Sequence, residues 1–299
     1  MSKIQVAIVG YGNIGRFALE AVEAAGDMEC VGVVRRSGSA DGIARLAPYK
    51  VVSDVRELGK VDVAILAVPS RKVEETAARY LQLGISTVDS FDIHTDICSL
   101  RSKLGSLAEA SGAVSVISAG WDPGSDSVVR ALMQALAPRG ISYTNFGPGR
   151  SMGHSVAAKA VPGVKDALSV TIPVGTGLHR RMVYVELEPG ADAEAVAAAI
   201  KADPYFAHDE THVIPVDSVG ALNDMGHGVN LVRKGVSGDT HNQLLEFNMK
   251  INNPALTGQV LVMAARAAVR QRPGCYTMIE IPVIDYLEGD RNTLIKQLV

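Results

Sequence analysis

Short continuous apolar runs alternate with helically spaced segments through the first part of the chain. The runs are rich in β-branched residues and end in turn residues, which is typical of strands buried on both faces. They cover residues 4–9, 30–34, 62–68, 84–90 and 113–118. Helical spacing covers residues 16–22, 72–83 and 100–110. This alternation predicts a doubly wound α/β fold, whose parallel strands bind ligands at their carboxyl ends.

Near residue 141 the pattern changes to strands with period-two alternation. They are predicted over residues 141–146, 167–174, 181–188, 212–218, 230–234 and 243–251. The clearest helix among them covers 192–201, and short Gly, Pro and Asn turns predict a largely antiparallel sheet in an α+β domain. A helical pattern over 255–270 is expected to return to the first domain. We therefore expect one domain from 1–120 and 254–299, with 121–253 inserted into it.

Composition and charge limit the partners of this chain. Its 299 residues are 47% hydrophobic and 20% charged, with a formal net charge of -3, enough for two domains with real cores. The absence of a Lys/Arg-rich run argues against nucleic acid or an anionic membrane as partner. No apolar run is long enough to span a bilayer, and the chain enters its first strand directly. We expect a cytoplasmic protein.

Cysteine and histidine spacing gives no sign of a metal site. Cys30, Cys98 and Cys275 lack metal-ligand or C-x-x-C spacing, and they fit a reduced compartment and core positions. His208 and His212 have His-x₃-His spacing, but a predicted strand and a nearby proline break the helix that such a site would need. We predict no metal.

A glycine-rich turn connects the first strand to the first helix. Gly10, Tyr11, Gly12, Asn13, Ile14 and Gly15 form G-x-G-x-x-G, the Rossmann dinucleotide fingerprint, which places a pyrophosphate over the helix N-terminus. An NAD site usually has an acid after the second strand, but here Arg35, Arg36 and Ser37 follow it. Two guanidiniums suit the 2′-phosphate of NADP. Two solvated loop arginines are the less favoured alternative.

Two aspartates are predicted at strand ends around the same crevice. The segments expected there are Gly10–Gly15, Arg35–Ser37, Pro69–Arg71, Ser90–His94 and Gly120–Ser125. Hydride leaves a Cα only if the attached amine is neutral, so a site for an α-amino acid needs an anion that binds the ammonium and accepts a proton. Asp92 and Asp122 fit this role, one of them with a raised pKa. Alternatively, Asp122 caps a helix and Asp92 stabilises a turn.

Three motifs carry a resemblance to a known family. They are Gly120-Trp121-Asp122-Pro123-Gly124, the segment 147–155 with sequence GPGRSMGHS, and Ser90-Phe91-Asp92. With the fingerprint, the chain resembles the meso-diaminopimelate D-dehydrogenases over essentially its whole length. The resemblance implies NADP-dependent oxidative deamination of the D-centre of meso-2,6-diaminopimelate to L-2-amino-6-oxopimelate and ammonia, which is reversible as reductive amination. It also implies a homodimer, with the inserted domain used for substrate binding and dimerisation.

The resemblance also assigns residues to the site. It implies that Asp92 and Asp122 are catalytic, and that Ser70, Pro123 and Gly124 join the fingerprint and Arg35–Ser37 in binding the cofactor. The implied substrate-binding residues are Trp121, Phe146, Met152, Gly153, Thr171, Arg181, His227 and Asn253.

Some of these assignments leave alternatives open. Strand faces alternate, so either Arg180 or Arg181 could hold the second carboxylate. His227 lies between two glycines and also fits a surface loop. His154 could order the attacking water or support its glycine-rich loop through a backbone hydrogen bond.

The chain departs from the family pattern in its substrate domain. Longer members have Trp in place of Phe146 and Gln in place of Met152, and these changes with the shorter chain predict a roomier, more apolar pocket. Another NADP-dependent reductase or an aldehyde dehydrogenase of the aspartate–lysine pathway is an alternative. The latter needs a cysteine nucleophile, for which Cys275 in a Pro-Gly-Cys turn is the candidate. A non-catalytic NADP sensor is a third alternative.

Overall fold

The computed structural model describes residues 3–222 and 226–299, and the chain divides into two compact units. The first comprises Met1–Ala131 and Pro254–Val299, and the second comprises Leu132–Asn253. The first unit extends past the expected boundary at residue 120. The chain entering this segment is tied to the first unit, because the Ala119 amide donates to the carbonyl of Asp89 at 2.7 Å.

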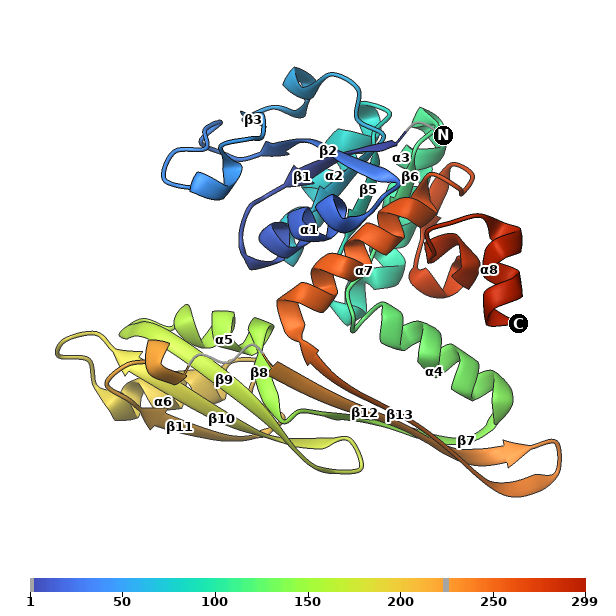
Figure 1. Ribbon diagram of the computed structural model, residues 1–299. Coiled ribbons are helices and arrows are strands. Elements are labelled where there is room, and N and C mark those ends of the chain that lie inside the picture. The colour runs from blue at the N-terminus through green and yellow to red at the C-terminus, as the bar shows by residue number, and fades with distance from the viewer. Residues whose placement is uncertain (1–2, 223–225) are drawn as a thin grey trace. The chain divides into compact units, whose positions relative to one another are not determined.

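Helices and strands of the described residues are labelled in Figure 1. The helices are α1 (Asn13–Ala24), α2 (Val73–Gln82), α3 (Ile97–Ser111), α4 (Ser125–Leu136), α5 (Met152–Lys159), α6 (Ala193–Ala202), α7 (Asn253–Ala268) and α8 (Arg291–Leu298). The strands are β1 (Ile4–Val9), β2 (Met28–Val34), β3 (Val51–Val52), β4 (Val63–Leu66), β5 (Ser86–Asp89), β6 (Val114–Val116), β7 (Arg139–Phe146), β8 (Gly149–Ser151), β9 (Val164–Gly175), β10 (Leu178–Leu187), β11 (Glu210–Pro215), β12 (Gly226–Ser237), β13 (Thr240–Asn252) and β14 (Gly274–Tyr276). Within residues 3–222 and 226–299, none of the helices combines the length and the hydrophobicity needed to span a bilayer.

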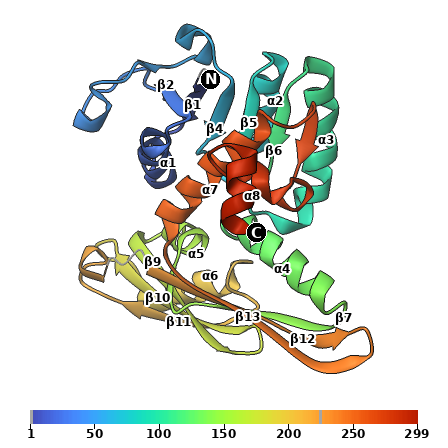
Figure 2. The same cartoon turned by 45° about the vertical axis from the view of Figure 1, so that its right-hand side comes forward.

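The first unit is a doubly wound parallel sheet, as the alternation of strands and helices predicts. Its seven described strands have the order β14-β6-β5-β4-β1-β2-β3. Side chains alternate between two cores: Val6 and Ile8 of β1 pack with α1 and α7, whereas Ala7 and Val9 pack with α2 and α3. Figure 2 shows α2 and α3 next to each other. The order reverses around β1, so the fingerprint turn lies at the switch point where such sheets bind ligands.

The carboxyl end of the chain completes this sheet, in a way that the sequence pattern does not predict. Cys275 is not in a turn but in the edge strand β14, which pairs with β6 in parallel, and its side chain is buried. The prediction that all three cysteines occupy core positions is wrong for Cys98, which is exposed on α3. Cys30 is half-buried. A three-residue strand carries too short a pattern to be separated from the turn before it.

The second unit contains two sheets of described strands. One has the order β11-β10-β9-β8, and the other has the order β13-β12-β7. Helices α5 and α6 cover the first of these, where Ala158, Val183 and Ile200 share a core. Figure 1 shows β12 and β13 as one long antiparallel ribbon, joined along the register from Gly226–Asn252 to Ser237–Thr240.

Two details of this unit differ from the sequence pattern. Most strand pairs are antiparallel, but β10 and β11 are parallel. Helix α6 lies between them in the chain and returns the chain to the end of the sheet where β10 begins, so β11 runs in the same direction as β10. The glycine-rich segment at 147–155 does not remain a loop throughout, since α5 begins at Met152. The inserted α+β domain predicted from the sequence is confirmed.

Candidate functional site

The fingerprint turn has the backbone that a dinucleotide site needs. Gly10 has φ +90°, and a Cβ there would lie 2.4 Å from the carbonyl oxygen of Ala67. A Cβ on Gly15 would lie 2.2 Å from the oxygen of Gly10, which explains the close packing of α1 on the turn. By contrast, a Cβ on Gly12 would meet nothing within 4 Å. This open space, at the N-cap of α1, is where a pyrophosphate can approach the backbone and the helix dipole.

The helix behind this turn is suited to an anion. The N-cap residue, Gly12, has no side chain to hydrogen-bond the helix start, and the first turn of α1 contains no acidic residue. Tyr11 and Ile14 are half-buried beside the turn, and Asn13 is exposed. The N-terminal N–H groups and the positive end of the helix dipole therefore meet no competing anion from the helix itself.

The arginine pair lies in the loop after β2. Arg36 and Ser37 are exposed, whereas Arg35 is half-buried and its Nη1 donates to the carbonyl of Ser39 at 2.5 Å. This bond shapes the loop and leaves other donors of the Arg35 fork, together with the Arg36 side chain, for an anion. The loop fits a 2′-phosphate, since no acidic residue occupies the strand end.

The two candidate catalytic aspartates follow different strands of the first unit. Asp92 is exposed after β5 and accepts a hydrogen bond from Ser70 Oγ at 2.6 Å, so the loops after β4 and β5 are joined. Asp122 lies after β6, and its Oδ1 accepts from Arg130 Nη1 at 2.6 Å. The Asp122 side chain is 9% exposed. Asp122 is not the N-cap of α4, because the helix begins at Ser125. Its carboxylate instead contacts Arg130, within the helix.

Tight backbone packing shapes the loop that carries Asp122. Trp121, Pro123 and Gly124 are buried, and a Cβ on Gly124 would lie 1.9 Å from the Gly120 oxygen. The Gly120 amide donates to the Pro123 carbonyl at 3.0 Å. Only glycine fits position 124, which has φ +142°. These contacts fix the direction in which Asp122 leaves the backbone.

A third carboxyl in this loop region, Asp126, is absent from the sequence prediction. It is fully buried on α4, and its Oδ2 lies 3.8 Å from Arg130 Nη2, so one guanidinium is shared between Asp122 and Asp126. Burial, followed by the charge of Asp122, raises the pKa of Asp126 to about 7. The sequence prediction gives the raised pKa to Asp92 or Asp122. In the structure, Asp126 is the buried member of this group.

The second unit contains a buried guanidinium next to a threonine. Arg181 on β10 is 9% exposed and lies directly opposite Thr171 of β9. Its Nη1 donates to Thr171 Oγ1, and its Nε donates to Asp209 Oδ2 at 2.6 Å. Arg180 points to the other face, where its Nε pairs with Glu210 Oε1 at 2.9 Å. Strand alternation thus places Arg181, not Arg180, on the interior face.

Phe146, at the end of β7, lies beside two histidines of the same unit. The amide of Phe146 donates to His179 Nε2 at 2.8 Å, and the Phe146 ring lies 5.4 Å from His179 and 6.5 Å from His227 between ring centroids. His227 is 6% exposed on β12, so the surface-loop alternative is wrong for it: it pairs with Ile251 of β13, and its ring lies beside that of Phe146. Burial, followed by the charge of Arg181, lowers the pKa of His179.

The remaining predicted residues of the second unit lie around α5 and the end of β13. Met152 and Gly153 start α5, and both are half-buried. Asn253 is 8% exposed, and its Nδ2 donates to the Arg150 carbonyl at 3.5 Å, which joins the start of α7 to β8.

His154 has a local structural environment. Its Nδ1 is hydrogen-bonded to Ser151 Oγ at 2.8 Å, and the rings of Tyr205 and Phe206 contact it edge-on. Burial, followed by the charge of Arg181, lowers the pKa of His154 to about 4. The imidazole is therefore neutral at physiological pH. It packs α5 against the segment before β11.

No metal or thiol chemistry is supported in the described residues. They contain no group of three or more His, Cys, Asp or Glu side chains placed to hold a metal ion. Burial, followed by the charge of Asp89, raises the pKa of the Cys275 thiol to about 12. A thiol with that pKa is not a nucleophile near neutral pH, which argues against the aldehyde dehydrogenase alternative.

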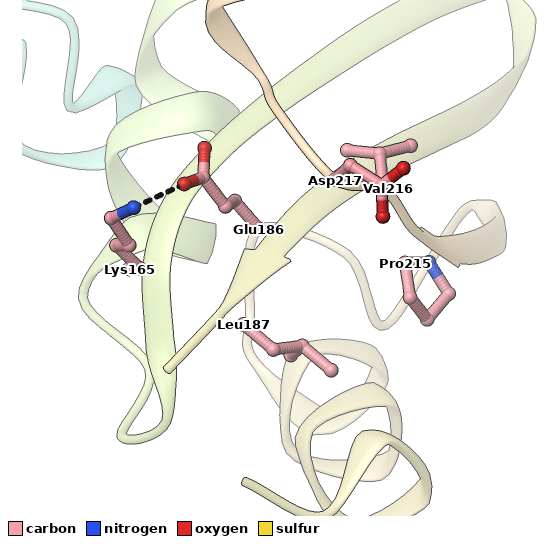
Figure 3. Close-up of a pocket in the computed structure, with 6 residues that line it drawn as sticks. All are labelled: Lys165, Glu186, Leu187, Pro215, Val216 and Asp217. Carbon is pink, nitrogen blue, oxygen red and sulfur yellow. Dashed lines mark hydrogen bonds and ion pairs between the residues drawn. The ribbon is translucent and has the colours of Figure 1, made fainter. Parts of the chain in front are cut away.

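A surface hollow in the second unit is separate from the predicted site residues. Figure 3 shows it lined by Lys165, Glu186, Leu187, Pro215, Val216 and Asp217. Lys165 Nζ pairs with Glu186, whose other oxygen accepts from the Val219 amide at 3.2 Å. The hollow has one basic and two acidic side chains, and none of its lining residues belongs to the predicted site.

The structure adds three side chains to the predicted set. Asp126 and Arg130 follow Asp122 at intervals of one helical turn, so the pattern Asp-x₃-Asp-x₃-Arg is a signal visible in the sequence. Asp209 lies on a turn before β11, and nothing local marks it as the partner of Arg181.

Comparison with known proteins gives consistent results for both units. Residues 120–253 match the diaminopimelic acid dehydrogenase C-terminal domain, and residues 4–88 match an oxidoreductase family with an NAD-binding Rossmann fold. The chain is 65% identical over 299 residues to a meso-diaminopimelate D-dehydrogenase of Bacteroides fragilis, covering 100% of both proteins. It is 38% identical to that of Lysinibacillus sphaericus, covering 94% of this chain and 95% of the relative.

Solved structures agree with these matches. The Corynebacterium glutamicum DAP dehydrogenase in complex with DAP superposes with a TM-score of 0.91 at 30% identity, over 100% of both chains. An engineered D-amino acid dehydrogenase bound to NADP⁺ superposes with a TM-score of 0.86 at 30% identity, again over 100% of both chains.

Proposed function

The chain belongs to the meso-diaminopimelate D-dehydrogenase family, and we propose on that basis that it oxidises the D-centre of meso-2,6-diaminopimelate with NADP. The products are L-2-amino-6-oxopimelate, ammonia and NADPH, and the reverse reaction is a reductive amination. The observation that carries this proposal is the 65% identity to the Bacteroides fragilis enzyme over the whole of both chains.

The first unit binds the cofactor in this proposal. Gly10–Gly15 hold the pyrophosphate over the N-terminus of α1, and Arg35, Arg36 and Ser37 hold the 2′-phosphate. Ser70, with Pro123 and Gly124, completes the cofactor-binding set. NADP, when bound, supplies the hydride acceptor. Functionally, we assign residues 1–120 and 254–299 to cofactor binding and 121–253 to substrate binding and dimerisation.

Asp92 and Asp122 act on the D-centre. Their carboxylates bind the D-ammonium, and one of them accepts the proton whose loss leaves the amine lone pair free to expel hydride. The Arg130 contact at 2.6 Å orients Asp122. The Ser70 contact at 2.6 Å orients Asp92 in the same way.

Arg181 and its neighbours bind the L-centre. The guanidinium is already ordered by Asp209 and Thr171, so little side-chain entropy is lost when it binds the distal carboxylate. His227 adds a hydrogen bond, and Asn253 accepts from the L-ammonium. Trp121, Phe146, Met152 and Gly153 line the substrate, with Phe146 and Met152 leaving a roomier, more apolar pocket than their larger or more polar counterparts.

Initial rates of NADPH formation test this proposal. Purified protein with NADP is assayed side by side on meso-, LL- and DD-diaminopimelate. We expect the meso compound to be oxidised and the LL compound, which has no D-centre, to be inert. Ammonia-dependent consumption of NADPH should appear in the reverse direction with L-2-amino-6-oxopimelate. A reductase of another substrate or a non-catalytic sensor would fail both assays.

We propose in addition that the protein is a cytoplasmic homodimer. The three-stranded sheet offers exposed apolar side chains on its two outer strands, among them Ile141 of β7 at 54% and Leu244 of β13 at 59% exposure. Such a face suits a two-fold interface. Size-exclusion chromatography with light scattering should give twice the chain mass, and a monomer at micromolar concentration would contradict the dimer. The three free cysteines suit a reducing compartment.

A further inference from the structure

Asp89, the last residue of β5, is a buried carboxyl that none of the roles above uses. It is 0% exposed. Its Oδ1 accepts two backbone hydrogen bonds, from the Phe91 amide at 2.9 Å and from the Ser118 amide at 3.1 Å. Its own carbonyl accepts a third, from the Ala119 amide at 2.7 Å. One residue therefore holds backbone on two different strand-end loops.

These two loops carry the proposed catalytic aspartates. Phe91 immediately precedes Asp92, and its buried side chain anchors that loop in the apolar core. Ser118 and Ala119 lead directly into the turn that carries Asp122. The loops also touch, since a Cβ on Gly120 would lie 3.5 Å from the Cβ of Ser90. A change at Asp89 would thus displace both aspartates.

The backbone at Ser118 needs such support. Its φ of +54° lies in the left-handed region, which is unfavourable for a residue with a Cβ. A conformation of this kind persists only where surrounding contacts hold it. The hydrogen bond from the Ser118 amide to Asp89 is one such contact.

Burying the Asp89 carboxyl has a desolvation cost that an apolar side chain would not have. Burial raises its pKa to about 7, and its Oδ2 has no hydrogen-bond partner among the described residues. A valine or leucine would avoid this desolvation cost, but it could not accept hydrogen bonds from Phe91 and Ser118. The carboxyl is therefore better explained by loop geometry than by stability.

We propose that Asp89 is a positioning residue for amine oxidation, which clamps the Asp92 and Asp122 loops to each other through the Phe91 and Ser118 amides. This inference rests on the proposed function for its kinetic consequence. The clamp itself is a property of the fold and can be measured without substrate.

Three variants separate positioning from general stability. Asp89→Ala removes the acceptor, whereas Asp89→Asn keeps an acceptor oxygen in a side chain of nearly the same shape. Thr87→Ala is the matched control: Thr87 is also fully buried on β5, and its Oγ1 is 3.0 Å from Ser115 Oγ on β6. That bond joins the same two strands without reaching either loop.

We expect Asp89→Ala to lower kcat for meso-diaminopimelate by at least about tenfold, because small misplacements of catalytic groups have effects of this size or larger. The Kd for NADP should change less than kcat, because Gly10–Gly15 and Arg35–Ser37 follow other strands and only Pro123 and Gly124 of the cofactor set lie on a clamped loop. Asp89→Asn should recover kcat to within about threefold of the wild type. Thr87→Ala should lose thermal stability but keep its kcat. Equal kcat losses in Asp89→Ala and Thr87→Ala, or no recovery in Asp89→Asn, would overturn the proposal.

Amide hydrogen exchange tests the clamp without any reaction. Exchange at Phe91 and Ser118 should be faster in Asp89→Ala than in the wild type and unchanged in Thr87→Ala. If Asp89→Ala does not fold, Asp89→Asn at pH 8 replaces it, with exchange at these amides about five- to tenfold faster because a neutral acceptor is weaker than a carboxylate. Unchanged exchange refutes the clamp. If exchange is faster in the Asp89 variant but the wild type itself does not oxidise diaminopimelate, the clamp holds and only the proposed function is refuted.

Discussion

Replacing Asp126 by asparagine should stabilise the protein at high pH more than at low pH. Asp126 is fully buried, and its pKa is raised from 3.8 to about 7. Between these two values the folded state holds a proton that the unfolded state has lost. The free energy of unfolding of the wild type therefore falls as pH rises through this window. Asp126→Asn does not titrate and has no such loss.

The magnitude follows from the width of the window. From pH 5 to pH 7, two of the roughly three pH units between 3.8 and about 7 contribute, at about 1.36 kcal/mol each. The stability of Asp126→Asn relative to the wild type should thus rise by about 2–3 kcal/mol between pH 5 and pH 8. The cost of burying the new amide, on the order of 1–3 kcal/mol, is nearly the same at both pH values and cancels from this difference.

Urea denaturation followed by tryptophan fluorescence measures this effect at the right place. Trp121 is the single tryptophan of the chain, it is 8% exposed, and its carbonyl accepts a hydrogen bond from the Asp126 amide at 2.9 Å. Linear extrapolation gives the free energy of unfolding at pH 5 and pH 8. Glu109→Gln, an exposed change on α3, is the control and should differ from wild type by less than about 0.5 kcal/mol at both pH values. An Asp126→Asn advantage that is the same at both pH values would refute the reasoning.

Three further predictions concern binding and catalysis. Arg35→Ala combined with Arg36→Asp should raise KM for NADP by at least about 30-fold and let NAD bind comparably, since each lost charged hydrogen bond costs about 1.5–3 kcal/mol; unchanged NADP kinetics would exclude the 2′-phosphate role. Arg181→Ala should raise KM for meso-diaminopimelate strongly while sparing D-amino acids with one carboxylate, with Arg180→Ala as the matched control on the opposite strand face; the assignment fails if both substrate types suffer equally. Asp122→Asn should lower kcat by about 100-fold or more at unchanged NADP affinity and remove the acidic limb of the pH–rate profile; near-wild-type activity would rule Asp122 out as an essential base.

Local sequence patterns were sufficient for the central strands of the first unit, β1, β2, β4, β5 and β6, and for the cofactor turn. Apolar runs such as Ile4–Val9 form strands that are buried on both faces, so their consecutive residues are apolar and the strand is visible in the local sequence. The fingerprint glycines are equally local, because Gly10 and Gly15 are required by contacts with the turn and its neighbouring strand end. Asp92 and Asp122 could be placed at strand ends for the same reason.

Contacts between distant segments were decided only by the tertiary structure. The edge strand at Cys275 and the parallel pairing of β10 with β11 depend on partners far away in the chain. Arg181 and Arg180 have the same local sequence context, and the sheet face that α5 and α6 cover determines which one is buried. Asp89 and Asp209 are ordinary acidic residues in the sequence, and their roles follow from the amides and the guanidinium that the fold brings to them. A residue's type and spacing thus determine what chemistry it can perform, but burial and the identity of its partner, which set its charge and orientation, are properties of the folded chain.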